Sequence, residues 1–217
     1  MPTPISLVVA SGNPKKLAEI RALLEPLGIR TLAPAEVGGL PGVDEDAPDF
    51  AGNAAKKATS GAAHCGHLCL ADDSGLTVVA LDGAPGVHSA RFAGRHGDDA
   101  ANNALLLERL DGALDRRAAF VCSLAVAAPD GRLIATASGR VEGRIATAPR
   151  GDGGFGYDPV FELDDPRAPD HPGTGRTFAE IGAEAKGAVS HRGRALRALV
   201  EALPAALETV RRAPETS

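Results

Sequence analysis

Tryptophan is absent from this 217-residue sequence, and aromatic residues make up only 3% of it. Proteins that bind single-stranded nucleic acid stack the bases on several aromatic side chains, so this scarcity argues against such a surface. The formal net charge of −5 argues in the same direction, because surfaces that bind nucleic acid are usually basic. We therefore expect no nucleic-acid partner.

Cysteine is also scarce, with Cys65, Cys69 and Cys122 as the whole set. Three cysteines in apolar surroundings do not form a disulfide framework. The first ten residues lack the basic segment of a signal peptide and are typical of a first strand. No apolar run approaches the length of a membrane span. We expect a protein of the reducing cytoplasm without a membrane partner.

The overall composition is that of an ordinary globular protein, with 44% hydrophobic and 24% charged residues. Its length suits one α/β domain, with room for two lobes. We expect one domain over residues 1–210 and a frayed tail over residues 211–217. The spacing predicts strands at 5–10, 29–32, 117–128 and 133–141 and helices over 14–27, 49–63, 100–110, 177–186 and 195–203.

The hexamer Ala-Asp-Asp-Ser-Gly-Leu, residues 71–76, carries two adjacent carboxylates between two short apolar runs. Loops at strand ends often hold catalytic groups, because the sheet fixes their position. Successive strand residues point to opposite faces, so we expect Asp72 and Asp73 to diverge. Asp73 is the preferred catalytic candidate. The alternative is a plain Asp-Ser-Gly turn.

The segment Ser11-Gly12-Asn13-Pro14-Lys15-Lys16 joins the first predicted strand to the first predicted helix. Ser11 or Asn13 can cap that helix, and Pro14 suits its first turn. The free N–H groups of a helix N-terminus attract anions, and two lysines add positive charge. The segment is therefore a candidate phosphate site. The alternative is an ordinary helix start with solvated lysines.

The segment from Gly151 to Pro159 combines glycines with two of the few aromatic residues, Phe155 and Tyr157. Glycines let a ligand approach the main chain closely, and either aromatic ring could cover a flat base. The alternative is a flexible surface loop. At Ser190-His191-Arg192 two cations stand where a helix begins and oppose its dipole, which suggests a negative or hydrogen-bonding partner. The alternative, equally weighted, is a structural role.

Taken together, these segments resemble the noncanonical purine nucleoside triphosphate pyrophosphatases, also called inosine/xanthosine triphosphatases. The resemblance runs from Ser6 to Leu203, and each motif is weak alone, whereas the ordered set is specific. Its motifs are Ser11-Gly12-Asn13-x-x-Lys16-x-x-Glu19-Ile20, Phe50-x-x-Asn53-Ala54-x-x-Lys57-Ala58, Ala71-Asp72-Asp73-Ser74-Gly75-Leu76, Gly83-Ala84-Pro85-Gly86-x-x-Ser89-Ala90-Arg91, Gly153-Gly154-Phe155-Gly156-Tyr157-Asp158-Pro159 and Ser190-His191-Arg192-Gly193-x-Ala195-Leu196.

The resemblance implies an α/β fold with an elongated mixed sheet, flanking helices and two lobes around a central cleft, in a homodimer. It implies a Mg²⁺-dependent hydrolase that splits ITP, dITP or XTP into the monophosphate and pyrophosphate and so cleanses the nucleotide pool. Asp73 would be the catalytic carboxylate, and Asp73, Asp44 and Glu45 would hold the metal. The substrate would contact Ser11, Gly12, Asn13, Pro14, Lys15, Lys16, Ser74, Phe155, Gly156, Tyr157, Asp158, Lys186, His191 and Arg192.

The sequence departs from the family pattern at three places. With Asp44 as the metal-side acid, an aspartate stands where a glutamate is usual. Gly52 stands where an acidic residue is expected before Asn53, and the polar segment 162–176 is longer than expected and predicted to be mobile. Two other functions stay open on the residues alone. One is a nucleotide sensor that binds without hydrolysis, although such a protein would not need Asp73 and a partner acid. The other is a pyrophosphatase for modified pyrimidine triphosphates.

Overall fold

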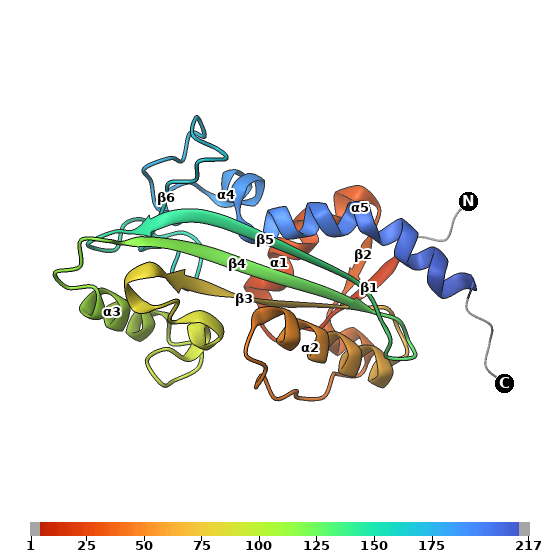
Figure 1. Cartoon of the computed structure of the whole chain (residues 1–217). Coiled ribbons are helices and arrows are strands. Elements are labelled where there is room, and N and C mark those ends of the chain that lie inside the picture. Colours follow the sequence, from red (N-terminus) through yellow and green to blue (C-terminus); the bar gives the residue numbers. More distant parts are fainter. Residues whose placement is uncertain (1–4, 213–217) are drawn as a thin grey trace. The chain divides into compact units, whose positions relative to one another are not determined.

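The computed structural model describes residues 5–212 (Figure 1). The chain divides into two compact units. The first unit comprises the described residues of 1–73, 123–139 and 195–217. The second unit comprises residues 74–122 and 140–194. The prediction of one domain over residues 1–210 stays a prediction. Of the predicted frayed tail, residues 211 and 212 end a helix, and residues 213–217 lie outside the described part.

One mixed sheet runs through the fold, with the strand order β2-β1-β3-β4-β5-β6. Strand β1 is parallel to β2 and to β3, whereas β5 and β6 are antiparallel. A short turn at Pro129 to Gly131 joins β4 to β5, as the sequence predicts. The predicted α/β class with a mixed sheet and flanking helices is confirmed. The strands are β1 (Ser6–Val9), β2 (Arg30–Leu32), β3 (Cys69–Val78), β4 (Arg117–Ala127), β5 (Leu133–Ile145) and β6 (Phe161–Leu163).

The first unit has a core of small side chains. Alanines at 54, 58 and 62 form one stripe of helix α2 and pack with Val8 of β1 and Ala71 of β3. A side chain at Gly61 would place its Cβ only 2.7 Å from the Cys69 sulfur, so glycine allows α2 to approach β3 closely. The helices of this unit are α1 (Pro14–Leu24), α2 (Phe50–Cys65) and most of α5 (His191–Arg212).

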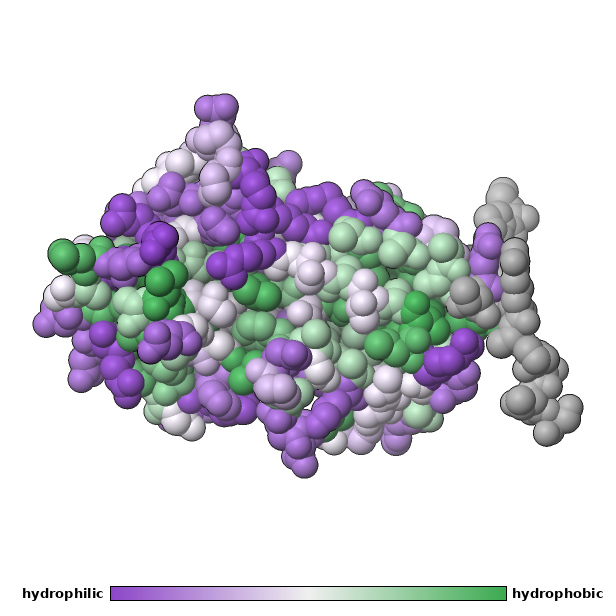
Figure 2. All heavy atoms as spheres, viewed as in Figure 1, coloured by the Kyte–Doolittle hydropathy of each residue, from purple (hydrophilic) through white to green (hydrophobic). Residues whose placement is uncertain are grey.

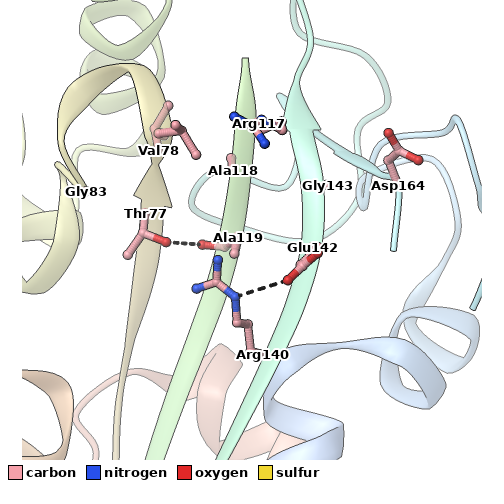
Figure 3. Close-up of a pocket in the computed structure, with 11 residues that line it drawn as sticks. Thr77, Val78, Gly83, Arg117, Ala118, Ala119, Arg140, Glu142, Gly143 and Asp164 are labelled. Atoms are coloured by element: carbon pink, nitrogen blue, oxygen red, sulfur yellow. Dashed lines mark hydrogen bonds and ion pairs between the residues drawn. The ribbon is translucent and has the colours of Figure 1, made fainter. Parts of the chain in front are cut away.

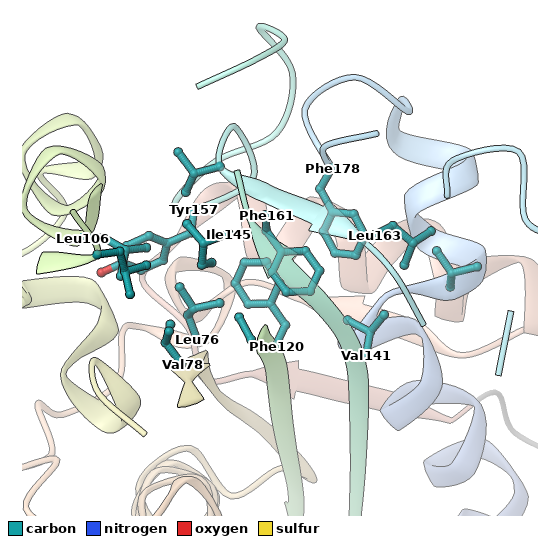
Figure 4. Close-up of a cluster of buried hydrophobic side chains, with 14 residues drawn as sticks. Leu76, Val78, Leu106, Phe120, Val141, Ile145, Tyr157, Phe161, Leu163 and Phe178 are labelled. Atoms are coloured by element: carbon teal, nitrogen blue, oxygen red, sulfur yellow. The ribbon is translucent and has the colours of Figure 1, made fainter. Parts of the chain in front are cut away.

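The second unit contains most of the aromatic residues, in the cluster of Figure 4. The rings of Phe120 and Phe161 lie 4.5 Å apart between centroids, and Phe178 packs on both. This dense core fixes the ends of β3, β4 and β5 that lie in the unit. Its helices are α3 (Asp99–Arg109) and α4 (Ala183–Val189), with 3₁₀ turns at Val79–Leu81 and Gly86–Arg91.

Two predicted elements are wrong. Residues 71–76 are not a junction between two strands but the middle of the single strand β3. The helix predicted over Thr177–Lys186 does not exist as such, because Gly182 adopts a positive φ of 76° and α4 begins only after it. Thr177 instead donates its hydroxyl to the Arg150 carbonyl at 2.8 Å.

None of the described helices is long and apolar enough to cross a membrane. On the face drawn in Figure 2, hydrophobic residues form patches that hydrophilic residues separate. Within the described part of the chain, the exposed large hydrophobic side chains are those of Leu27, Val79, Leu114 and Leu133, which are far apart in the sequence.

Candidate functional site

Strand β3 carries the two adjacent carboxylates on opposite faces, each with its own lysine. The Lys16 ammonium lies 2.7 Å from Asp72 Oδ1, and the Asp72 side chain is completely buried. The Lys57 ammonium lies 2.9 Å from Asp73 Oδ1. The alternation of a strand explains this divergence, and the two lysines offset the cost of burying adjacent acids. The prediction that Asp72 and Asp73 diverge is confirmed.

Asp73 and Glu45 share one ammonium. Lys57 Nζ lies 2.9 Å from Asp73 Oδ1 and 3.4 Å from Glu45 Oε2, and the Asp73 side chain is 8% exposed. Burial raises the pKa of the Asp73 carboxyl above its ordinary value; the Lys57 ammonium opposes the rise and the Glu45 carboxylate adds to it. Two carboxylates that converge on one cation form a candidate site for a hard metal ion, which prefers oxygen ligands.

Asn53 fixes the other oxygen of Asp73. Its Nδ2 donates to Asp73 Oδ2 at 3.2 Å, and its Oδ1 accepts from Ala47 N at 3.0 Å. Asn53 is completely buried on α2, and Asp49 caps that helix by accepting from Gly52 N. One amide therefore ties the acidic segment before α2 to the carboxylate on β3.

The acid beside this network is Glu45. Its neighbour Asp44, which aligns better with the family pattern when no gap is placed, is exposed, whereas Glu45 is half-buried and pairs with Lys57. Among the described residues, no group of three or more His, Cys, Asp or Glu side chains forms a ready metal site. A metal at Asp73 and Glu45 would therefore complete its shell with water and substrate oxygens, as Mg²⁺ commonly does.

The predicted phosphate segment forms the start of α1. Asn13 caps the helix, since its side chain accepts from Lys15 N and Lys16 N, and Asn13 N donates to Ser11 Oγ. Pro14 is the first helical residue, and Lys15 is exposed. A pocket of about 240 Å³ in the first unit is lined by part of this segment and by Lys57, the lysine that pairs with Asp73 and Glu45. Its lining includes Ser11, Gly12, Glu45, Lys57 and Gly61.

In the second unit, the predicted base-binding loop is rigidly held. Asp158 Oδ2 accepts from Phe155 N at 2.8 Å and from the Lys186 ammonium at 2.7 Å. The same ammonium lies 4.7 Å from the centre of the Phe155 ring. Tyr157 is buried and its hydroxyl donates to the Ser89 carbonyl at 2.9 Å. Burial raises the pKa of the Tyr157 hydroxyl, so it stays protonated. Tyr157 therefore supports the loop, and Phe155 is its more accessible ring.

The start of α5 joins this group. Ser190 caps the helix by accepting from Gly193 N at 3.1 Å. Arg192 is 1% exposed and its Nη2 donates to Ser74 Oγ at 2.9 Å. The His191 ring stacks on Phe120 at 4.7 Å between centroids. The two cations that looked unfavourable at a helix start are thus built into the core of the unit.

A second pocket, of about 390 Å³, lies in the second unit over strands β3, β4 and β5 (Figure 3). None of the predicted site residues lines it. At its floor Thr77 Oγ1 donates to the Ala119 carbonyl, and Arg140 pairs with Glu142 at 3.5 Å. Three of its charged side chains are in ion pairs, since Arg117 in the lining also pairs with Asp115, and we assign no function to this pocket.

Comparison with known proteins gives the family. The sequence profile of the Ham1 family matches residues 7–202. The chain belongs to the Ham1 family. Among Ham1 relatives, a dITP/XTP pyrophosphatase of an Exiguobacterium species is 48% identical over 195 residues, covering 90% of this chain and 95% of its own. That of Aromatoleum aromaticum is 50% identical, covering 92% and 97%. The resemblance drawn from the motifs is confirmed.

Solved Ham1 structures agree with the fold. A HAM1 protein from Coxiella burnetii matches with a TM-score of 0.79 and 40% identity, covering 93% of this chain and 99% of its own. A nucleoside-triphosphatase, or dITP/XTP pyrophosphatase, from Mycobacterium abscessus matches with a TM-score of 0.70 and 47% identity, covering 90% and 99%.

Proposed function

We propose that this Ham1 protein hydrolyses noncanonical purine nucleoside triphosphates (ITP, dITP and XTP) to the monophosphate and pyrophosphate, and so keeps them out of nucleic acid. The observation that carries the proposal is the buried Asp73 carboxylate, which shares the Lys57 ammonium with Glu45 and receives a hydrogen bond from Asn53. Relatives of nearly half-identical sequence carry the name dITP/XTP pyrophosphatase. A triphosphate-cleaving enzyme needs such an acid, whereas a nucleotide sensor does not.

Asp73 and Glu45 would hold a divalent ion, which we propose to be Mg²⁺. When bound, that ion neutralises phosphate oxygens and lowers the pKa of a coordinated water. The residues fit it, because both carboxylates already converge on one cation and offer only oxygen ligands.

The other residues of the first unit would bind the triphosphate. Lys16 and Lys57 supply positive charge, and the N–H groups at the start of α1 add the field of a helix N-terminus. Asp73 would accept a proton from the attacking water, and its raised pKa makes it a stronger base than an exposed carboxylate. Asn53 keeps that carboxylate turned toward Lys57 and Glu45 during the reaction.

The second unit would bind the base. The Phe155 ring offers a flat face, and the Lys186 ammonium and the Arg192 guanidinium lie near it as donors. His191, which precedes Arg192 on α5, would add a further donor. A 6-keto purine presents an acceptor and an N1–H donor where adenine presents the reverse, and mismatched buried polar groups discriminate strongly. The homodimer that the resemblance implies and the cytoplasmic location expected from the composition belong to the same proposal, and light scattering and cell fractionation check them.

A panel of triphosphates tests the function. ITP, dITP, XTP, GTP, ATP and dUTP are incubated with the full chain, with and without Mg²⁺, and the products are separated by anion exchange. We expect monophosphate and pyrophosphate from ITP, dITP and XTP, with Mg²⁺ required. Diphosphate with free phosphate would contradict the reaction, saturable binding without turnover would favour the sensor, and a preference for dUTP would favour the pyrimidine enzyme.

A further inference from the structure

Helix α3 grips one residue of the base-binding loop from both sides. Asp99 Oδ2 accepts from Gly156 N at 2.8 Å, and Asn103 Nδ2 donates to the Gly156 carbonyl at 2.8 Å. Gly156 has a positive φ of 61°, a conformation that side-chain-bearing residues rarely adopt. Both polar groups of this backbone position are therefore fixed by side chains that are four residues apart on one face of the helix.

The side-chain amide of Asn103 suits this contact with Gly156. Its Nδ2 also donates to the Asp99 carbonyl at 2.9 Å, so both N–H groups of the amide point at carbonyl oxygens. The Asn103 Oδ1 is buried and has no hydrogen-bond partner among the described residues. An unsatisfied buried acceptor is costly, and an apolar side chain would avoid that cost. The asparagine is therefore explained by its two donors, and one of them holds Gly156.

The neighbours of Gly156 have other supports. Phe155 N donates to Asp158 Oδ2, which also accepts from Lys186, and the Tyr157 hydroxyl donates to Ser89 O. Tyr157 lies in the hydrophobic cluster that also contains Leu106 of α3 (Figure 4). Gly156 is the position whose backbone depends on α3. It connects Phe155, the more accessible ring, to the anchored Tyr157.

We propose that Asp99 and Asn103 are positioning residues for purine selection: by clamping Gly156 they hold Phe155 and the loop backbone in the geometry that reads a 6-keto purine. This inference rests on the proposed function of the loop. Groups that read a base by hydrogen bonds discriminate only while their positions are fixed to within about 0.5 Å. Loosening the clamp therefore weakens selection and binding of the base more than the chemical step on the phosphates.

Four variants of the full-length protein test the clamp. Asn103→Asp keeps the shape but turns a carboxylate toward two carbonyls, and Asp99→Ala removes the acceptor for Gly156 N. Asp99→Asn is the conservative rescue, because its amide oxygen can still accept. Asn102→Asp is the matched control: Asn102 is buried on the same helix but accepts from Ala93 N at 2.8 Å and does not contact the loop peptide.

Two readouts separate positioning from folding. The first is the kcat and KM for ITP and for ATP. The second is acrylamide quenching of tyrosine emission, which reports on the loop alone because Tyr157 is the only tyrosine and there is no tryptophan. For Asn103→Asp and Asp99→Ala we expect the KM for ITP to rise about tenfold, kcat to stay within about threefold, and the preference for ITP over ATP to fall about tenfold. Quenching of Tyr157 should increase.

Asp99→Asn should stay near wild type in both readouts, and Asn102→Asp should keep the wild-type preference even if its melting temperature falls. The inference is overturned if preference and quenching are unchanged in both disruptive variants, or if Asn102→Asp loses the preference equally. If Asn103→Asp does not fold, the comparison of Asp99→Ala with Asp99→Asn decides whether the inference holds. Should the wild type release no pyrophosphate, the proposed function fails, and the clamp is then judged by whether ITP protects Tyr157 from quenching in the wild type and not in Asp99→Ala.

Discussion

Two buried aspartates, one in each unit, show how differently a fold can treat the same side chain. Asp73 in the first unit has one ammonium and one amide against its oxygens, and that ammonium also pairs with Glu45. Asp165 in the second unit is 2% exposed and accepts from Glu142 N at 3.0 Å, from the Arg194 guanidinium at 2.6 Å and from Arg167.

The pKa values of the two carboxyls move in opposite directions. For Asp73, burial is the largest influence and the pKa rises. For Asp165, burial alone would also raise the pKa, but the hydrogen bonds from Arg167, Glu142 N and Arg194 outweigh it and hold the pKa well below its ordinary value. A carboxylate that is incompletely compensated suits metal binding or proton transfer, whereas a fully compensated one suits structure. The contrast supports the proposed role of Asp73 and gives Asp165 a structural one.

The contacts of Asp165 hold a segment, residues 162–176, for which the sequence predicts no regular structure. The prediction that residues 162–176 are mobile is wrong. Strand β6 overlaps their start, Arg167 donates to the Arg140 carbonyl, and Asp165 accepts from Arg194. Arg194 lies on α5 shortly after His191 and Arg192. The segment therefore has a defined attachment near the start of that helix.

The largest expected effect is on kcat, where substitution of Asp73 and of Asp165 should have very different results. Asp73→Asn should lower kcat for pyrophosphate release from ITP by about 10³-fold, because the proton acceptor and a metal ligand are lost together. Asp165→Asn should stay within about threefold of wild type. Steady-state assays with Mg²⁺, with folding checked by circular dichroism, measure both. Near-normal turnover by Asp73→Asn would remove Asp73 from its role.

A smaller effect is expected on the Mg²⁺ requirement, which tests whether Glu45 or Asp44 helps Asp73 to hold the metal. Glu45→Gln should raise the Mg²⁺ concentration for half-maximal activity about tenfold, since the acid that shares Lys57 with Asp73 is lost. Asp44→Asn, its matched control, should leave that concentration unchanged because Asp44 is exposed. Titration of activity with Mg²⁺, and of the protein with Mn²⁺ by calorimetry, compares them. The reverse order of effects would assign the metal to Asp44.

The smallest effects are on stability. Replacing each aspartate by asparagine should change the free energy of unfolding in opposite directions. The pKa of Asp165 is depressed on folding, so its contribution is present above the unfolded pKa of about 4 and is lost as the pH falls below it. Asp165→Asn should therefore lower the free energy of unfolding by about 2 kcal/mol at pH 7, and the difference should narrow below about pH 4.

The pKa of Asp73 is raised on folding, so ionisation of its carboxyl opposes folding as the pH rises from about 4 through the folded-state pKa. Asp73→Asn should consequently be as stable as wild type or more stable by up to about 1 kcal/mol at pH 7, with no difference below about pH 4. Urea denaturation at several pH values measures both variants. A loss of stability in Asp73→Asn at pH 7 would show that its carboxylate is fully compensated, as that of Asp165 is.

Much of the local geometry around the candidate site could be predicted from the sequence, because the motifs are local. The cap at Asn13, the helix with Asn53 and Lys57, and the divergence of Asp72 and Asp73 all follow from helical and strand periodicity. Asp99 and Asn103 were missed, because the helix at residues 100–110 was interpreted only by its leucines. The signal available was two polar residues four apart on a helix that also has an apolar side.

The order of residues by itself determined strands β1, β2, β4 and β5, most of the helices and the family, since these depend on spacing along the chain. Only the tertiary structure decided that Glu45 and not Asp44 shares Lys57 with Asp73, that Tyr157 is a support, and that α3 grips Gly156. Those choices depend on which side chains from distant segments come within hydrogen-bond reach. Burial then determines whether a charge is compensated, and no pattern along one segment contains that information.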